Sequence, residues 1–222
     1  AGAFLTPSRV GLCATMGHSS IPVIKRLKIA IISTGDELKQ PGQKLERGEI
    51  YESNSFGISG LVKWLGHEPT RLHCVGDTLD DLRKTLNSAA KEYDLILTNG
   101  GVSMGEWDLV RKIMEDEGDL HFWRVKLRPG SPPLFGTWNN TPIFGLPGNP
   151  VSSHVVFRML VAPWIRNATM ANGPHEPRAT AKLATKVKST KDCLTLRRVS
   201  IESGKDGLFA HQKIHQGSGN IA

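Results

Sequence analysis

The chain has 222 residues, of which 39% are hydrophobic and 22% are charged. This length and composition predict a globular protein with enough interior for a core, and they exclude collagen-like, disordered and disulfide-scaffold proteins. Every apolar run is shorter than the roughly 20 residues needed to cross a bilayer, so no membrane partner is expected. The scattered Cys13, Cys74 and Cys193 indicate neither a disulfide framework nor a zinc site, which favours a cytoplasmic protein.

The net charge is +7, and most of the excess lies near the C-terminus. From His175 onward there are nine Lys and Arg against four Asp and Glu. A basic segment can bind nucleic acid, but these cations alternate with apolar residues and few aromatic side chains accompany them. We therefore expect a solvated β-surface and no nucleic-acid partner.

The first 26 residues predict one short helix and one strand-like stretch. Thr6 is placed to cap the helix, with Pro7 at its first position, and residues 21–26 follow as an extended apolar segment. These elements are too few to form a domain alone, so we expect residues 1–26 to be the remnant of an N-terminal domain.

Residues 27–170 alternate strand-like and helix-like patterns. Short, nearly continuous apolar runs at 28–34 and 94–98 are typical of strands buried on both faces, and further strands are expected at 71–75, 121–127 and 143–144. Apolar stripes at helical spacing predict helices at about 54–65, 79–89 and 107–117, and a fourth begins at Asn149-Pro150. This order predicts an α/β domain of three layers, a mainly parallel sheet with helices on both faces.

The pattern changes after Asn167. Residues 171–180 are typical of a linker, and the segments 181–188, 193–202 and 207–214 alternate with the period of β-strands. We expect residues 175–222 to form a small, incomplete, antiparallel all-β domain.

Ligands of open α/β sheets bind beyond the carboxyl ends of the strands, so the residues that follow each strand are the first candidates. The turn Gly100-Gly101-x-Ser103-x-Gly105 precedes a helix and predicts a phosphate cradle built from backbone amides. A tight strand-to-helix turn is the alternative.

Two acids lie beside that turn, Asp77 and Asp108. Carboxylates near a phosphate repel it unless they share a divalent cation, and Mg²⁺ is the natural choice. The alternative is that Asp77 caps one helix and Asp108 occupies the first turn of the next. Asp36 and Glu37, at the end of the first strand, are further candidates, and the alternative is that they only cap a turn before Pro41-Gly42.

Two further segments are candidates for anion binding. If residues 121–128 form one strand, Arg124, Lys126 and Arg128 share a face and would bind an oxyanion; ordinary solvated charge is the alternative. The loop 145–150, with Pro147, Gly148 and Pro150, leads rigidly into a helix whose first amides are available for another anion, although a purely architectural turn is equally consistent.

Several motifs follow one another along nearly the whole chain. They are S-T-G-D-E-L (33–38), G-E-I-Y-E-S-N (48–54), G-G-V-S-M-G-E-W-D (100–108), R-P-G (128–130) and G-L-P-G-N-P-V-S (145–152). In this order and spacing the chain resembles the molybdopterin molybdenumtransferase family, the MoeA-type enzymes related to the gephyrin E domain. The resemblance implies an enzyme of molybdenum cofactor biosynthesis that inserts molybdenum from molybdate into adenylylated molybdopterin, with release of AMP and with Mg²⁺ involved.

The resemblance also implies roles for single residues. It makes Asp77 and Asp108 the catalytic acids that bind the metal, with Glu37 beside them as a third catalytic residue. It assigns substrate binding to the following positions: Thr34, Gly35, Asp36, Asn54, Gly100, Gly101, Ser103, Gly105, Arg124, Arg128, Pro147, Gly148, Pro150 and Ser218. Arg124 and Arg128 stand where relatives often have Lys, so the charge is kept and the geometry differs.

The resemblance further implies a homodimer and, as a partner, the molybdopterin adenylyltransferase. Two other functions remain open. The chain is also consistent with an adenylyltransferase built on the same domain, although the G-L-P-G-N-P loop leading to a β domain argues against it, and with a gephyrin-like scaffold that binds a protein partner without catalysis.

Overall fold

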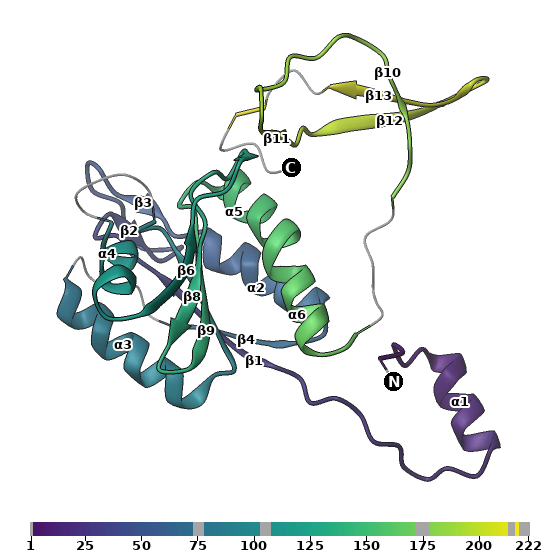
Figure 1. Cartoon of the computed structure of the whole chain (residues 1–222), viewed down its shortest axis with the longest axis horizontal. Helices are drawn as coiled ribbons and strands as arrows, with labels where there is room; N and C mark the ends of the chain where they lie inside the picture. The colour runs from purple at the N-terminus through teal and green to yellow at the C-terminus, as the bar shows by residue number, and fades with distance from the viewer. Residues whose placement is uncertain (1, 73–77, 103–107, 172–177, 213–215, 218–222) are drawn as a thin grey trace.

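The computed structural model describes residues 2–72, 78–102, 108–171, 178–212 and 216–217. Within these ranges the largest element is a six-stranded sheet with the order β4-β1-β5-β9-β8-β6 (Figure 1). Its strands are β1 (Lys28–Ser33), β4 (Glu68–Arg71), β5 (Leu95–Asn99), β6 (Asp119–Trp123), β8 (Leu134–Trp138) and β9 (Thr141–Leu146). The pairs β1–β4, β1–β5 and β5–β9 are parallel, whereas β8 and β6 add antiparallel pairs at one side. The predicted mainly parallel sheet is confirmed.

Helices cover both faces of this sheet, as expected for three layers. One face packs against α2 (Asn54–Trp64), α5 (Pro150–Val156), the π-helical turn η1 (Phe157–Val161) and α6 (Ala162–Ala168). The other face packs against α3 (Leu79–Glu92) and α4 (Leu109–Asp116). Alternate residues of β1 enter different cores, with Ile29 and Ile31 on the α2 face and Ala30 and Ile32 on the α3 face. Within the described helices, none is both long and apolar enough to cross a membrane.

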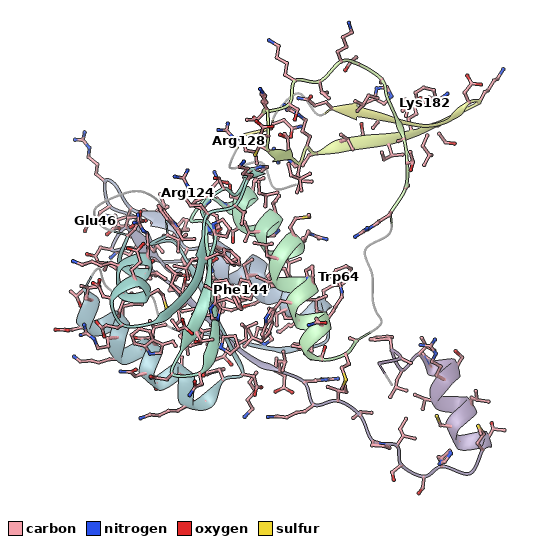
Figure 2. The ribbon with its side chains drawn as sticks, in the orientation of Figure 1. Glu46, Trp64, Arg124, Arg128, Phe144 and Lys182 are labelled. Atoms are coloured by element: carbon pink, nitrogen blue, oxygen red, sulfur yellow. The ribbon has the colours of Figure 1, made fainter. Side chains whose placement is uncertain are left out.

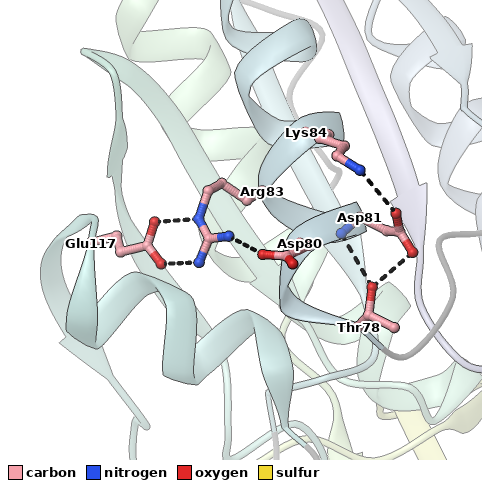
Figure 3. A network of polar contacts seen from close by, with 6 residues as sticks. All are labelled: Thr78, Asp80, Asp81, Arg83, Lys84 and Glu117. Carbon is pink, nitrogen blue, oxygen red and sulfur yellow. Dashed lines mark hydrogen bonds and ion pairs between the residues drawn. The ribbon is translucent and has the colours of Figure 1, made fainter.

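The helix ends follow the local chemistry of the sequence. The hydroxyl of Thr78 accepts a hydrogen bond from the amide of Asp81 at 3.2 Å and opens α3 (Figure 3). The Asn149 side chain accepts from the amide of Ser152 at 3.1 Å and caps α5. Figure 3 also shows Arg83 of α3 held between Asp80 and Glu117, which ties α3 to the end of α4. These predicted helix starts are confirmed.

Two local predictions are wrong, and a third is covered by the structure only at its start. Residues 21–26 form no strand. The strand expected at 71–75 is β4, which ends at Arg71, and residues 73–75 lie outside the described ranges. The strand expected at 121–127 ends at Trp123, because Arg124 has a φ of +71°, which breaks the extended alternation. The hairpin between β8 and β9 was not predicted; Asn139 and Asn140 form its turn, both with positive φ.

The remaining elements lie outside the main sheet. The helix α1 (Pro7–Thr15) is capped by Thr6 as predicted, and none of its residues is buried. The short strands β2 (Leu38–Lys39) and β3 (Ile50–Tyr51) pair in parallel. Near the C-terminus, β10 (Lys182–Leu183), β13 (Gly207–Gln212) and β12 (Val199–Gly204) form a sheet, and β11 (Leu194–Thr195) pairs with β7 (Leu127–Arg128). Because β10 runs parallel to β13, this sheet is mixed and not antiparallel throughout.

Candidate functional site

A cavity of about 270 Å³ lies at the carboxyl edge of the main sheet. We call it the sheet-edge cavity. Its walls come from five places: the end of β1, the β2–β3 pair, the start of α2, the turn after β5 that leads to α4, and the loop between β9 and α5. Its lining residues are Ser33, Thr34, Gly35, Glu37, Leu38, Ile50, Tyr51, Glu52, Ser53, Asn54, Asn99, Gly100, Gly101, Asp108, Leu109, Gly148 and Pro150. Segments far apart in the sequence thus meet where an open α/β sheet binds its ligands.

Two glycines shape the turn after β5. Gly100 and Gly101 have φ values of +93° and +63°. A Cβ on Gly100 would lie 3.0 Å from Thr34 Oγ1, and a Cβ on Gly101 would lie 3.0 Å from Val110 Cγ2. The turn therefore needs glycine for its backbone conformation and for its packing. This agrees with the alternative interpretation of the motif, a tight strand-to-helix turn. Phosphate binding remains a prediction, and Ser103 and Gly105 lie outside the described residues.

Two carboxylates predicted to act in the site line the sheet-edge cavity. Glu37 follows β1 with its carboxylate against the Gly35 backbone, and Asp108 stands at the N-cap of α4. The Asp108 side chain makes no capping hydrogen bond to α4, but its carboxylate lies at the end of the helix where the dipole favours negative charge, so the alternative interpretation stays open. Asp77 lies outside the described residues, so its proximity to Asp108 remains a prediction. Asp36 is exposed and does not line the cavity.

The chemistry of the two carboxylates fits a hard divalent cation. Glu37 and Asp108 offer only oxygen ligands, the donor type that Mg²⁺ takes together with water and phosphate oxygens. Among the described residues, no three His, Cys, Asp or Glu side chains gather as a ready-made metal site.

A buried carboxylate that the sequence did not reveal lies at the floor of the cavity. Glu52 is 2% exposed, and its Oε1 accepts hydrogen bonds from Ser33 Oγ at 3.1 Å and from the Ser55 amide at 2.8 Å. Its other oxygen accepts from the Ser55 hydroxyl. Glu52 thus joins the end of β1 to the first turn of α2. The available signal was an acid three residues before Ser55, but glutamate is not a favoured capping residue.

Two asparagines also border the sheet-edge cavity. Asn54 Nδ2 donates to the carbonyl of Gly148 at 2.8 Å, which connects α2 to the loop before α5. Asn99, the last residue of β5, is 3% exposed, and its Oδ1 accepts from Ser153 Oγ at 3.1 Å. Asn54 was among the predicted residues, whereas Asn99 was not. A buried amide at the carboxyl end of a central strand was the signal for Asn99.

The loop from 145 to 150 contributes only part of its predicted set. Gly148 and Pro150 line the cavity, whereas Pro147 is buried and does not.

The predicted row of cations is not formed. Arg124 is exposed beside the Trp123 ring, with its guanidinium carbon 5.4 Å from the ring centroid. Arg128 instead lines a second cavity of about 470 Å³, which we call the arginine cavity. Its other lining residues are Pro129, Val151, Val155, Thr190, Thr195, Leu196, Arg197, Arg198 and Gln216. Figure 2 shows Arg128 beside the C-terminal strands and Arg124 further down the main sheet. Ser218 lies outside the described residues.

The family described as a probable molybdopterin binding domain matches residues 30–167, which include every segment that lines the sheet-edge cavity. The chain belongs to this family. The resemblance found in the sequence motifs is therefore confirmed at the level of the domain.

Relatives of this molybdopterin-binding domain carry consistent names. The chain is 39% identical over 164 residues to a molybdopterin molybdenumtransferase of Haemophilus influenzae, covering 74% of this chain and 41% of the relative. It is 35% identical over 207 residues to molybdopterin molybdenumtransferase 2 of Mycobacterium tuberculosis, covering 90% of this chain and 51% of the relative. The chain thus spans about half the length of these relatives.

Solved structures agree with this assignment. Two crystal structures of the molybdopterin biosynthesis MoeA protein from Pyrococcus horikoshii superpose with TM-scores of 0.82 and 0.81, at 27% and 25% identity. They cover 96% and 98% of this chain and 52% of theirs. The α/β domain and the C-terminal strands therefore follow the fold of these proteins.

Proposed function

We propose that this protein acts in molybdenum cofactor biosynthesis and inserts molybdenum from molybdate into adenylylated molybdopterin, with release of AMP. The observation that carries the proposal is the sheet-edge cavity, where Thr34, Asn54, Gly100, Gly101 and Asp108 meet although they are far apart in the sequence. The names of the relatives at 35–39% identity support the same reaction.

The residues of the cavity would bind different parts of the substrate, according to their chemistry. The turn that begins at Gly100 is the proposed phosphate site, and Thr34 would add a hydroxyl beside it. The Gly100 amide itself donates to the carbonyl of Leu146 at 3.0 Å, so amides further along the turn would bind the phosphate. Asp108, together with Asp77, which lies outside the described residues, would hold Mg²⁺ against the pyrophosphate, and Glu37 lines the same cavity. When bound, Mg²⁺ would neutralise phosphate charge and act as a Lewis acid on the bond that releases AMP.

The arginine cavity is the proposed site for molybdate or for the phosphate of the pterin. Arg128, Arg197 and Arg198 line it together, and guanidinium groups bind oxyanions through paired, charge-assisted hydrogen bonds. The ladder between β7 and β11 holds Arg128 beside the C-terminal strands, because the Leu196 amide donates to the Arg128 carbonyl at 2.7 Å. Ser218, which lies outside the described residues, stays a predicted substrate-binding residue.

The expected partners belong to the same proposal. A homodimer, a supply of substrate by the molybdopterin adenylyltransferase, and a cytoplasmic location all follow from the family resemblance. Neither an adenylyltransferase activity nor a purely scaffolding role is favoured, because the named relatives are molybdenumtransferases.

The test is an assay of AMP release with Asp108→Asn. We expect release from adenylylated molybdopterin to fall at least about 100-fold, as for removal of a group that stabilises charge in the transition state. The circular dichroism spectrum and the urea midpoint should stay unchanged. Asp116→Asn, at the exposed far end of the same helix, is the matched control and should keep full turnover. Undiminished turnover in Asp108→Asn would reject the proposed role.

A further inference from the structure

Two buried amide atoms at the sheet-edge cavity lack a hydrogen-bond partner among the described residues. They are Asn54 Oδ1 and Asn99 Nδ2. An unpaired buried polar atom destabilises the folded state, so native proteins seldom keep one without a reason. Both residues line the same cavity, so the two unpaired atoms belong to side chains of the candidate site and not to an apolar core.

The hydrogen bond that each amide already makes determines which of its polar atoms is unpaired. Asn54 Nδ2 donates to the carbonyl of Gly148, so its oxygen is the free acceptor. Asn99 Oδ1 accepts from Ser153 Oγ, so its NH₂ group is the free donor. Each side chain is therefore held by one hydrogen bond and offers the opposite group.

The contacts between the two segments bring these amides to one corner of the cavity. Asn54 binds Gly148, and a Cβ built on Gly148 would lie 3.7 Å from the Cα of Gly100. Gly100 directly follows Asn99. The corner thus presents one donor and one acceptor from neighbouring segments.

This pairing selects among possible ligands by chemistry. A phosphate at neutral pH offers mainly acceptors and cannot satisfy Asn54 Oδ1, and a cation cannot satisfy Asn99 Nδ2. The edge of a fused pyrimidine ring satisfies both, because adenine presents a ring nitrogen beside an amino group and pterin presents a carbonyl oxygen beside a ring N–H. A volume of about 270 Å³ is near the small end of ligand pockets and suits a single ring system.

We propose that Asn54 and Asn99 recognise the hydrogen-bonding edge of a fused pyrimidine ring, with Asn99 Nδ2 donating to the ring acceptor and Asn54 Oδ1 accepting from the adjacent N–H. This inference rests on the proposed function, since adenylylated molybdopterin carries both an adenine and a pterin. It assigns ring recognition to residues separate from the carboxylates and arginines.

The test is calorimetric titration of adenylylated molybdopterin into the wild-type protein and into Asn99→Asp. This variant keeps an oxygen for Ser153 and replaces the free donor by an acceptor, so we expect about tenfold weaker binding, equivalent to one hydrogen bond. Asn54→Ala removes the other member and should weaken binding similarly, which keeps the test decisive if Asn99→Asp does not fold.

Thr98→Val is the matched control. Thr98 is fully buried, and its Oγ1 also has no partner among the described residues, yet it does not line the cavity. We expect binding to Thr98→Val to equal that of the wild type. If Thr98→Val bound adenylylated molybdopterin more weakly than the wild type, any change to a buried polar group at the end of β5 would weaken binding. That result would overturn the proposal.

Competition by free AMP and by 6-hydroxymethylpterin identifies the ring. The competitor that occupies this corner should lose about tenfold in affinity with Asn99→Asp, and the other competitor should not. If AMP is that competitor, Asn99→Asp should bind GMP at least as well as the wild type does, because guanine presents two adjacent donors. A purely structural role of Asn99 would not change this preference.

The outcomes separate the two proposals. If the wild type binds adenylylated molybdopterin and both Asn99→Asp and Asn54→Ala bind it with unchanged affinity, ring recognition is overturned. This result includes the case in which water alone occupies the corner. The proposed function would then still stand. Failure of the wild type to bind adenylylated molybdopterin, AMP and the pterin overturns both.

Discussion

Single residues decide the shape of the sheet-edge cavity before any ligand enters. The turn after β5 brings the backbone of Gly100 close to Thr34, so a side chain there would meet Thr34 Oγ1 and the Thr34 carbonyl at 3.0 and 3.1 Å. The same residue has a φ of +93°, which L-amino acids other than glycine rarely adopt. Strain and contact therefore act in the same direction at this position.

Gly100→Ala should lower the free energy of unfolding by about 1–3 kcal/mol, since both the backbone and the contact with Thr34 become unfavourable. Urea denaturation measures this. Gly60→Ala is the control, because Gly60 is exposed within α2 and a Cβ there has no described neighbour within 4 Å. That variant should gain about 0.5–1 kcal/mol from helix propensity. Equal stability of the two variants would contradict this account.

Among the elements, α2 is held in an unusual way. Its N-cap residue Ser53 makes no side-chain capping bond. The buried Glu52 instead accepts hydrogen bonds from the Ser55 amide and from the hydroxyls of Ser33 and Ser55. Since α2 contributes Asn54 to the cavity, the anchoring of its first turn and the geometry of the site depend on one carboxylate.

Glu52→Ala should destabilise the protein by about 2–4 kcal/mol, because it leaves buried donors of Ser33 and Ser55 unpaired. Ser53→Ala should change stability by less than about 0.5 kcal/mol, since no capping bond is lost. Thermal or urea unfolding of the two variants provides the comparison. A larger loss for Ser53→Ala would show that the conventional cap supports α2.

The sequence predicted elements where local chemistry determines the structure. The Thr78 capping box, the Asn149-Pro150 start of α5 and the apolar strand β1 all occur as expected. The predictions from the sequence were wrong where tertiary contacts determine the local structure. Arg124 adopts a positive φ that alternation of residue types cannot reveal, and the pairing of β7 with β11 moves Arg128 to the arginine cavity. Glu52 and Asn99 were missed because their partners are far away or atypical.

At the scale of the whole molecule, two histidines make stability depend on pH. Burial, followed by the charge of Arg26, lowers the pKa of His67 below 6.5, and its Nδ1 accepts from the Leu27 amide. Burial, followed by the charge of Arg158, lowers the pKa of His154. In both cases the unfolded chain binds the proton more readily than the folded chain. The stabilisation is therefore complete above pH 6.5 and is lost as the pH falls below it.

The urea midpoint should accordingly fall between about pH 7 and pH 5, and the double variant His67→Gln, His154→Gln should show a flatter profile. Glu117, whose pKa is lowered by its hydrogen bonds to Arg83, responds only at lower pH, since its ordinary value is 4.5. The chosen window therefore isolates the histidines. An equally steep profile in the double variant would contradict this assignment.

The central claim is that the junctions after β1, β5 and β9 form one binding site for a nucleotide-linked pterin. A crystal structure of the protein with adenylylated molybdopterin and Mg²⁺ tests it most directly. We predict ligand density in the sheet-edge cavity, with the pyrophosphate at Gly100-Gly101 and the cation at Asp108. Density confined to another surface, with this cavity filled only by water, would contradict the account.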